Sequence, residues 1–217
     1  MLQASALAII AGYADTVGYL HFGAFAGLMT GNTILLGIEI ATGQFALAAF
    51  HILIIAAFLV GVMLSRAAMS LGWRSWLPLS FAGVLLAVCG FIEKDLGAIL
   101  LALAMGTQNS AANRFGGVAL NTVFITGNLQ KLGEELVALV TRSREDRKAG
   151  SGAGIYALVW ISYAAGAILG ALANAWIALP LLVPAAALPF VTRLPAPAIG
   201  QSQPKAPGAP GHRAGAG

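Results

Sequence analysis

The chain has 217 residues, of which 59% are hydrophobic and only 9% are charged, and its formal net charge is +4. A soluble domain carries about 25% charged residues, so this composition excludes a soluble globular protein and predicts an integral membrane protein. The basic residues are spread over short loops rather than gathered with aromatic residues in a stripe, which excludes a nucleic-acid-binding surface. The only cysteine, Cys89, excludes a disulfide framework and a cysteine-based metal site.

Six apolar stretches are predicted to be membrane helices, because a helix needs about 20 apolar residues to cross a bilayer. In chain order they are 5–21, 45–65, 77–92, 96–112, 155–173 and 177–191. The first stretch has no basic segment before it and runs past the length of a signal peptide, so we expect a retained helix. The last contains Pro180, Pro184 and Pro189, which predict a kink or a tilt.

The C-terminal end of the chain has a different composition. Residues 194–217 are rich in proline, glycine and alanine and cannot bury a core, so we expect a disordered cytoplasmic tail. Residues 1–193 are then predicted to be a single all-α membrane domain.

Two further apolar stretches, 22–42 and 115–140, are each interrupted around the same three-residue motif. The two copies are Thr30-Gly31-Asn32 and Thr126-Gly127-Asn128, at an offset of 96 residues. The matching residues that follow at the same offset are Leu36, Gly37 and Glu39 in the first copy and Leu132, Gly133 and Glu135 in the second. Weaker matches are Gly12 to Asp15 on Gly106 to Asn109 at an offset of 94, and Phe58, Gly61 and Leu64 on Tyr163, Gly166 and Leu169 at 105. We interpret the chain as two fused repeats, about 3–92 and 96–191.

The distribution of basic residues bears on how the two repeats are oriented. If both triplet stretches cross the membrane, there are eight crossings and parallel repeats, with basic residues divided eight against three. If both are re-entrant, six crossings remain as two inverted three-helix repeats, and eleven of the twelve lysines and arginines are cytoplasmic. The positive-inside rule favours the second topology, with only Lys94 outside and both termini in the cytoplasm. The triplet stretches are long enough to cross if kinked, so the eight-crossing alternative stays open.

The two triplets are candidate binding elements. Glycine permits close backbone approach, and threonine and asparagine supply a hydroxyl and an amide. Irregular backbone at membrane depth is tolerated only where it is buried in protein or lines a watery cavity. An interrupted helix there can bind a polar solute or an ion. The alternative is that Thr and Asn only satisfy the backbone of a kink.

A buried carboxyl group is the second candidate. Asp15 lies about ten residues into the first span, where a charged group costs about 2.5–3.5 kcal/mol, so it must face a partner or a cavity. Its counterpart in the second repeat is Asn109, which follows Gln108. If the first helices of the two repeats meet, Asp15 faces these amides. The pair is then either a proton- or cation-linked site or a hydrogen bond that joins two helices.

Other small and polar residues have simpler interpretations. Glycines four residues apart predict close helix packing, at Gly23, Gly27 and Gly31 and again at Gly166 and Gly170. His21 and His51 have no carboxylate or second histidine at ligand spacing, so we interpret them as isolated interfacial or packing residues and expect no metal site. The sequence has no HExxH or GxSxG motif and no nucleophile–base pair, which argues against an enzyme and gives no reason to expect a cofactor.

These motifs resemble those of the YoaK-like family of small bacterial membrane proteins, a domain of unknown function numbered 1275. The resemblance rests on 12–20 (GYADTVGYL), on 29–33 (MTGNT), and in the second half on 104–109 (AMGTQN), Arg114 and the pair Thr126-Gly127. It extends over about 2–191 and implies a bacterial cytoplasmic-membrane protein of about six spans. The resemblance implies no substrate, cofactor or catalytic residue.

We therefore predict a small transporter or channel in the lipid bilayer, for an unidentified small solute or ion. Its polar site near the middle of the membrane would be formed by Asp15, Thr30, Gly31, Asn32, Gln108, Asn109, Thr126, Gly127 and Asn128. A glycine-lined face could support a homodimer. The alternative is a membrane scaffold or accessory protein that transports nothing and whose polar residues only pack helices.

Overall fold

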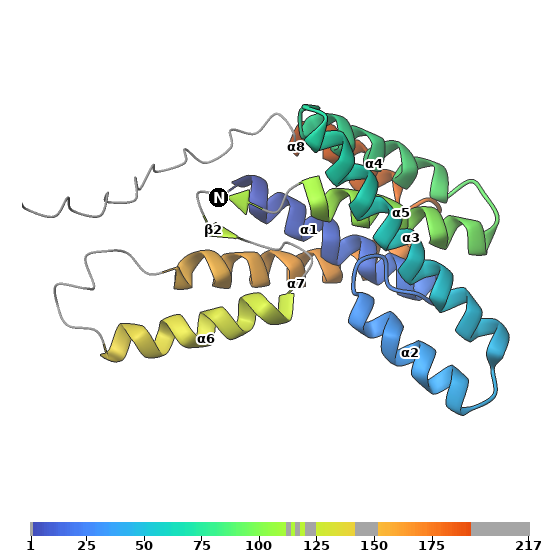
Figure 1. Ribbon diagram of the computed structural model, residues 1–217, viewed down its shortest axis with the longest axis horizontal. Coiled ribbons are helices and arrows are strands. Elements are labelled where there is room, and N and C mark those ends of the chain that lie inside the picture. The colour runs from blue at the N-terminus through green and yellow to red at the C-terminus, as the bar shows by residue number, and fades with distance from the viewer. Residues whose placement is uncertain (1, 112–113, 116–117, 120–124, 142–151, 192–217) are drawn as a thin grey trace, which may run out of the picture.

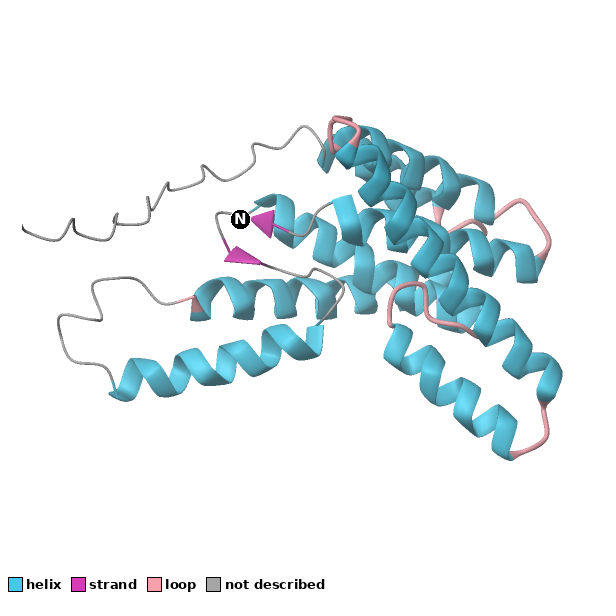
Figure 2. Cartoon of the chain, in the orientation of Figure 1, coloured by secondary structure: helices cyan, strands magenta, loops and turns pink. Residues whose placement is uncertain are grey.

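The computed structural model describes residues 2–111, 114–115, 118–119, 125–141 and 152–191. Within them the regular secondary structure is helical apart from one pair of two-residue strands, and loops and turns join the helices (Figures 1 and 2). The first half of the chain contains α1 (Leu2–Val17), the π-helix η1 (Gly18–Phe22), α2 (Met29–Ala41), α3 (Phe45–Ser70) and α4 (Trp76–Cys89). The second contains α5 (Lys94–Ala111), β1 (Arg114–Phe115), β2 (Val118–Ala119), α6 (Ile125–Thr141), α7 (Ala153–Trp176) and α8 (Leu182–Val191). The predicted tail at 194–217 lies outside the described residues.

Each of the six predicted spans coincides with a helix: α1 with η1, α3, α4, α5, α7 and α8. Among the described residues, α3 and α7 are long and apolar enough to cross a membrane on their own, with 26 and 24 residues. The helix of the last span begins only at Leu182, because turns that include Pro180 precede it. The all-α fold class predicted from the sequence is confirmed.

Helices α1 and α7 pack along each other at glycine contacts. A side chain on Gly166 would overlap the Ile9 carbonyl, and one on Gly12 would overlap the Tyr163 carbonyl. One turn further on, a Cβ on Gly170 would lie 2.7 Å from the Tyr13 carbonyl oxygen. The packing role predicted for Gly166 and Gly170 is confirmed, since only glycine allows the two backbones to approach this closely.

Helices α3 and α5 form a second contact of the same kind. A side chain on Gly61 would overlap the Leu103 carbonyl, and one on Gly106 would overlap the Phe58 carbonyl. The Thr107 hydroxyl adds a hydrogen bond across this interface to the Gly61 carbonyl, at 3.4 Å. Glycines thus set the spacing of both long helix pairs.

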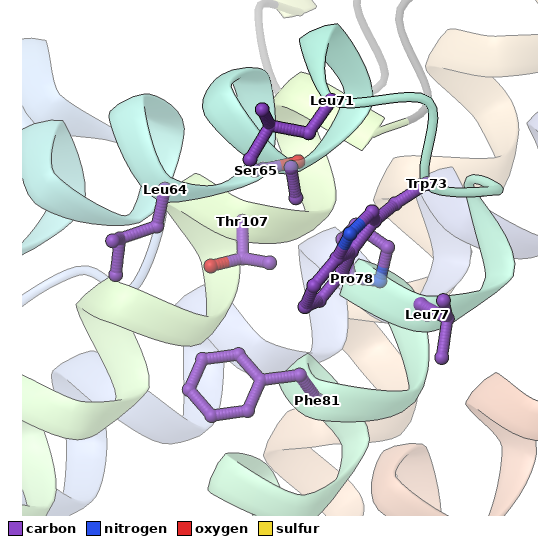
Figure 3. A pocket seen from close by; sticks show the side chains of 9 residues that line it. Leu64, Ser65, Leu71, Trp73, Leu77, Pro78, Phe81 and Thr107 are labelled. Carbon is purple, nitrogen blue, oxygen red and sulfur yellow. The ribbon is translucent and has the colours of Figure 1, made fainter.

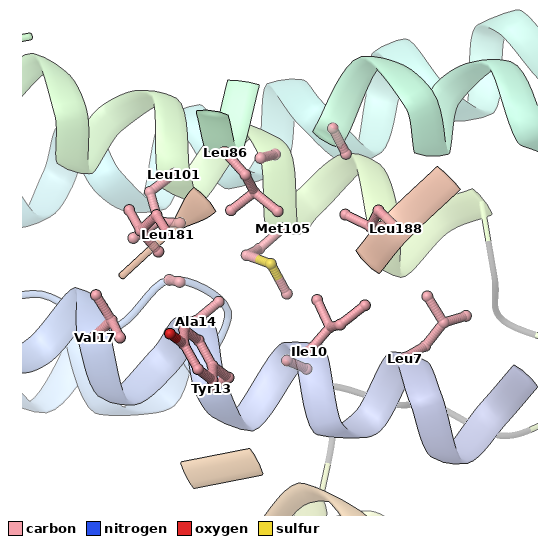
Figure 4. Packing of buried hydrophobic residues seen from close by; sticks show 14 of the residues in the cluster. Leu7, Ile10, Tyr13, Ala14, Val17, Leu86, Leu101, Met105, Leu181 and Leu188 are labelled. Atoms are coloured by element: carbon pink, nitrogen blue, oxygen red, sulfur yellow. The ribbon is translucent and has the colours of Figure 1, made fainter. Parts of the chain in front are cut away.

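The core lies between α1 on one side and α4, α5 and α8 on the other (Figure 4). Its large, fully buried side chains are Leu7, Val17, Leu79, Leu86, Leu101, Met105 and Leu188. Small residues such as Ala11 and Ala104 fill the closer contacts. This core holds α1 and α5, the helices that carry Asp15, Gln108 and Asn109.

Helices α2 and α6 lie at the periphery, against α3 and α7. Their buried side chains are polar and many of their large apolar side chains are exposed, which is the reverse of the pattern in a soluble protein. The only buried residues of α2 are Asn32 and Glu39, and the only buried residue of α6 is Asn128. Large apolar side chains such as Ile34 and Val137 point outward and are more than 60% exposed. Apolar side chains outside and polar ones inside suit a surface covered by lipid.

The prediction that the triplets themselves interrupt a helix is wrong. Thr30-Gly31-Asn32 lies in the first turns of α2, and Thr126-Gly127-Asn128 starts at the second residue of α6. Glycine lowers helix stability by only about 1 kcal/mol relative to alanine, so one glycine in the first turn does not break either helix. Before α2 the irregular backbone lies upstream of the triplet, at 23–28, and starts at Gly23 with a φ of 84° that favours glycine.

Candidate functional site

The carboxyl group of Asp15 holds the start of α2. Its Oδ1 accepts hydrogen bonds from the N–H groups of Gly27, at 2.6 Å, and Leu28, at 3.0 Å. Leu28 is the N-cap residue of α2, so a side chain of α1 caps a different helix. The position is favourable because a carboxylate lies at the positive end of the helix dipole.

The other oxygen of Asp15 bonds to the second half of the chain. The Tyr163 hydroxyl of α7 donates to Asp15 Oδ2 at 2.6 Å. Three donors therefore satisfy a side chain that is only 2% exposed. The predicted partner of Asp15 is wrong: the carboxyl group bonds to the loop and to Tyr163, and not to Asn109 or Gln108.

Asn32 fixes the same loop from its other side. Its Nδ2 donates to the Phe25 carbonyl at 2.8 Å, and its Oδ1 accepts from the Phe25 N–H at 2.9 Å. The Phe25 ring stacks on Tyr19 with centroids 4.7 Å apart and covers Gly31, where a side chain would collide with the ring. Asp15 and Asn32 together hold residues 23–28 in one conformation.

This loop returns the chain along α1. Asp15 lies seven residues, or about 10 Å, before the end of η1 at Phe22, yet its carboxyl group bonds to Gly27. Helix α2 then has 13 residues beside the 26 of α3, so it accompanies about half of α3 (Figure 1). The start of α2 is thus held deep beside α1, and its other end lies at the turn at 42–44.

The two triplets place their residues in the same way. Thr30 and Thr126 are exposed, whereas Asn32 and Asn128 are buried. Gly127 has open space where a side chain would point, unlike Gly31, which lies against Phe25. In both helices the asparagine faces inward and the threonine hydroxyl is accessible at the start of the helix.

Gln108 and Asn109 lie at the other end of α1 from the loop. Gln108 Nε2 donates to the Leu7 carbonyl of α1 at 3.2 Å and so joins α5 to α1. The Oε1 of Gln108 and the Oδ1 of Asn109 are buried and accept no hydrogen bond from a described residue. Gln108 therefore belongs to the α1–α5 contact, about two turns of α1 from Asp15.

The sequence interpretation of His51 as isolated is also wrong. Its Nδ1 lies 2.9 Å from Glu39 Oε2, in a buried pair that joins α3 to α2. The two residues are twelve apart in the sequence and lie on either side of the turn at 42–44. Their pairing could be predicted only by recognising that this turn joins two antiparallel helices. Glu39 and His51 make this interface polar inside an apolar surface.

Comparison with known proteins agrees with the membrane assignment. A family model described as "Protein of unknown function (DUF1275)" matches residues 3–194. The chain is similar to the UPF0700 transmembrane protein YoaK of Bacillus subtilis (strain 168), with 27% identity over 184 residues that cover 78% of this chain and 82% of the relative. It is also similar to the UPF0700 transmembrane protein RA0705 of Rhizobium meliloti (strain 1021), with 29% identity over 173 residues that cover 77% of this chain and 72% of the relative. No solved structure matches the chain.

Proposed function

The chain belongs to the DUF1275 family of proteins of unknown function, and from that premise we propose that it is a small permease of the bacterial cytoplasmic membrane. It is an integral membrane protein, like the transmembrane proteins to which it is similar. The proposal has three parts: inverted repeats, re-entrant half-helices, and a polar route past the exposed threonines at their ends. The observation that carries it is the anchoring of the α2 N-terminus to Asp15.

Equivalent glycine contacts support two repeats. The repeat offset of 94 takes Gly12 to Gly106, and the offset of 105 takes Gly61 to Gly166. These are the four glycines at which the α1–α7 and α3–α5 backbones approach most closely. The third helical segment of each repeat thus packs on the first helix of the other. Figure 1 shows α1 and α5 running in opposite directions, as inverted repeats require.

The return of the chain at 23–28 supports re-entrant half-helices. With 13 residues, α2 is about 20 Å long, which is shorter than the bilayer core of about 30 Å. Helix α6 has 17 residues and carries Lys131, Glu134 and Glu135. Six crossings by the other helices, with turns extending the short α4 and α8, would leave eleven of the twelve basic residues on the cytoplasmic side.

The ends of the half-helices are the proposed polar route. Thr30 and Thr126 are exposed at the starts of α2 and α6. No described residue forms a hydrogen bond with either hydroxyl. The Asp15 carboxylate offsets the positive end of α2, whereas the equivalent Asn109 carries no charge. The carboxylate leaves no net positive charge at the start of α2 to attract an anion, so there we favour a small uncharged polar solute.

A second function is favoured by a different observation. Every oxygen of Asp15 and both polar atoms of the Asn32 amide already bond within the protein. A scaffold or accessory protein that transports nothing needs such residues only to hold its helices together. In that case the exposed threonines would have no role in transport, and replacing them would not change the solute flux.

We test the permease in proteoliposomes by the rate of osmotic swelling with small neutral solutes such as glycerol and urea. The double variant Thr30→Val and Thr126→Val keeps the side-chain shape but loses both hydroxyls, so we expect solute flux to fall on the order of tenfold, the equivalent of one or two lost hydrogen bonds.

The matched control is Thr33→Val. Thr33 is also exposed on α2, but its hydroxyl already donates to the Met29 carbonyl at 2.8 Å, so the flux should stay at the wild-type level. If wild-type protein passes none of the solutes, or if the double variant and Thr33→Val give the same flux, the scaffold function replaces the permease.

A further inference from the structure

An apolar groove lies at the end of α3. We call it the Ser65 groove; it has a volume of about 500 Å³, within the range of ligand sites. Residues that define it are Ser65, Ala68, Leu71, Trp73, Phe81 and Thr107 (Figure 3). Leu71 lies at one end and Phe81 at the other, with the Trp73 ring between them. The groove is long and apolar, as an acyl chain requires.

One polar group in the groove is left without a partner. Ser65 Oγ is buried and makes no hydrogen bond with a described residue, and Ser65 is 1% exposed. The neighbouring Thr107 hydroxyl, by contrast, donates to the Leu103 carbonyl at 2.9 Å. Ser65 lies five residues, or about 8 Å, before the end of α3, so its depth matches the ester groups of a lipid rather than the acyl tails.

Two arginines adjoin residues of the groove in the sequence: Arg66 follows Ser65, and Arg74 follows Trp73. Between Phe45 and Cys89 the only lysines or arginines are Arg66 and Arg74, and there is no aspartate or glutamate. Both arginines are exposed, and neither forms an ion pair with a described residue. Trp73, next to Arg74, has the amphipathic ring that is typical of the membrane interface.

We propose that the Ser65 groove binds one anionic phospholipid. The acyl chain lies along Phe81 and Ala68, the Ser65 hydroxyl donates to an ester carbonyl, and Arg66 and Arg74 attract the phosphate. This site is separate from the proposed solute route and does not depend on transport.

The second repeat contains a groove that serves as an internal comparison. It has a volume of about 270 Å³ and is lined by Tyr13, Leu169, Ala173 and Ala187, with no serine or threonine among the described residues that line it. The position equivalent to Ser65 is Gly170, and Tyr13 occupies the place of Thr107. The adjoining turn at 177–181 carries no basic residue, so nothing there attracts an anionic headgroup.

The test is native mass spectrometry of the purified, delipidated full chain, titrated with phosphatidylglycerol or phosphatidylcholine of the same acyl composition. We expect one phosphatidylglycerol to bind roughly tenfold or more tightly than phosphatidylcholine, because two arginines lie near the headgroup. Arg66→Gln with Arg74→Gln should bring the two lipids to similar affinity.

Variants with a side chain that fills the groove distinguish lipid binding at this site from non-specific lipid binding elsewhere on the protein. Ala68→Trp should abolish lipid binding. Ala173→Trp, the equivalent change in the smaller groove, should leave the lipid bound. If Ala68→Trp does not elute as a single species, Ala68→Leu is the milder substitution for the same test. Equal binding of the two lipids by the wild type, or retention of lipid by Ala68→Trp or Ala68→Leu, would overturn the proposal.

Discussion

Replacement of Asp15 by alanine is expected to destabilise the protein more than any other single polar substitution. The change leaves the N–H groups of Gly27 and Leu28 and the Tyr163 hydroxyl without their acceptor. Each buried donor without a partner costs about 1–3 kcal/mol, so with three donors we expect a loss on the order of 3–9 kcal/mol in the free energy of unfolding. That is a large part of the about 5–15 kcal/mol of a typical domain.

Unfolding can be followed by the reactivity of a buried cysteine in the protein itself. Cys89 is the only cysteine and is 1% exposed, so a thiol-reactive fluorescent maleimide reacts as the fold opens on heating. Tyr163→Phe removes one donor and one bond, and its loss should be about 1–2 kcal/mol. Asp15→Asn keeps an acceptor oxygen for the loop and should lie between the two. A midpoint for Asp15→Ala equal to that of the wild type would contradict the proposed anchoring of α2.

The second large effect is expected at the glycine contacts. In Gly106→Ala the new methyl group would overlap the Phe58 carbonyl, and in Gly166→Ala it would overlap the Ile9 carbonyl. The obstacle is backbone rather than a flexible side chain, so the helices must separate. We expect each change to cost at least about 1–3 kcal/mol, measured with the same Cys89 assay.

Two other glycines provide matched controls for the glycine contacts. Gly37 in α2 and Gly133 in α6 lie at matching positions 96 residues apart, and each has open space where a side chain would point. Alanine is the better helix former, so Gly37→Ala and Gly133→Ala should be neutral or stabilising by up to about 1 kcal/mol. If Gly106→Ala and Gly37→Ala shifted the midpoint alike, close backbone contact would not hold α3 and α5 together.

Apolar length and glycine spacing made the helices predictable from the sequence. The six long stretches needed only their composition, because a chain in lipid has few alternatives to a helix. Gly166 and Gly170 revealed a packed face because their spacing matches one turn. The same spacing wrongly predicted close helix packing at Gly23. This glycine ends η1 with a positive φ and has open space where a side chain would point.

The contacts of the candidate site could not be predicted in the same way. The charge of Asp15 indicated a partner but not which one, since Tyr163 is 148 residues away and the loop bonds through its backbone. Glu39 and His51 looked unrelated because their pairing depends on the direction of α2. The position of the helix break was missed because Gly and Asn in the first turn of α2 resemble a break when only composition is considered.

The most direct test of the whole account is the sidedness of the two ends of the α1–α2 segment. In a Cys89→Ala background, Gln3→Cys and Gln44→Cys are labelled with a membrane-impermeant maleimide in spheroplasts, before and after lysis. A re-entrant α2 predicts opposite sides: Gln44→Cys reacts in intact spheroplasts, and Gln3→Cys reacts only after lysis. If both positions react on the same side of the membrane, α2 crosses the bilayer, and the proposed inverted topology is wrong.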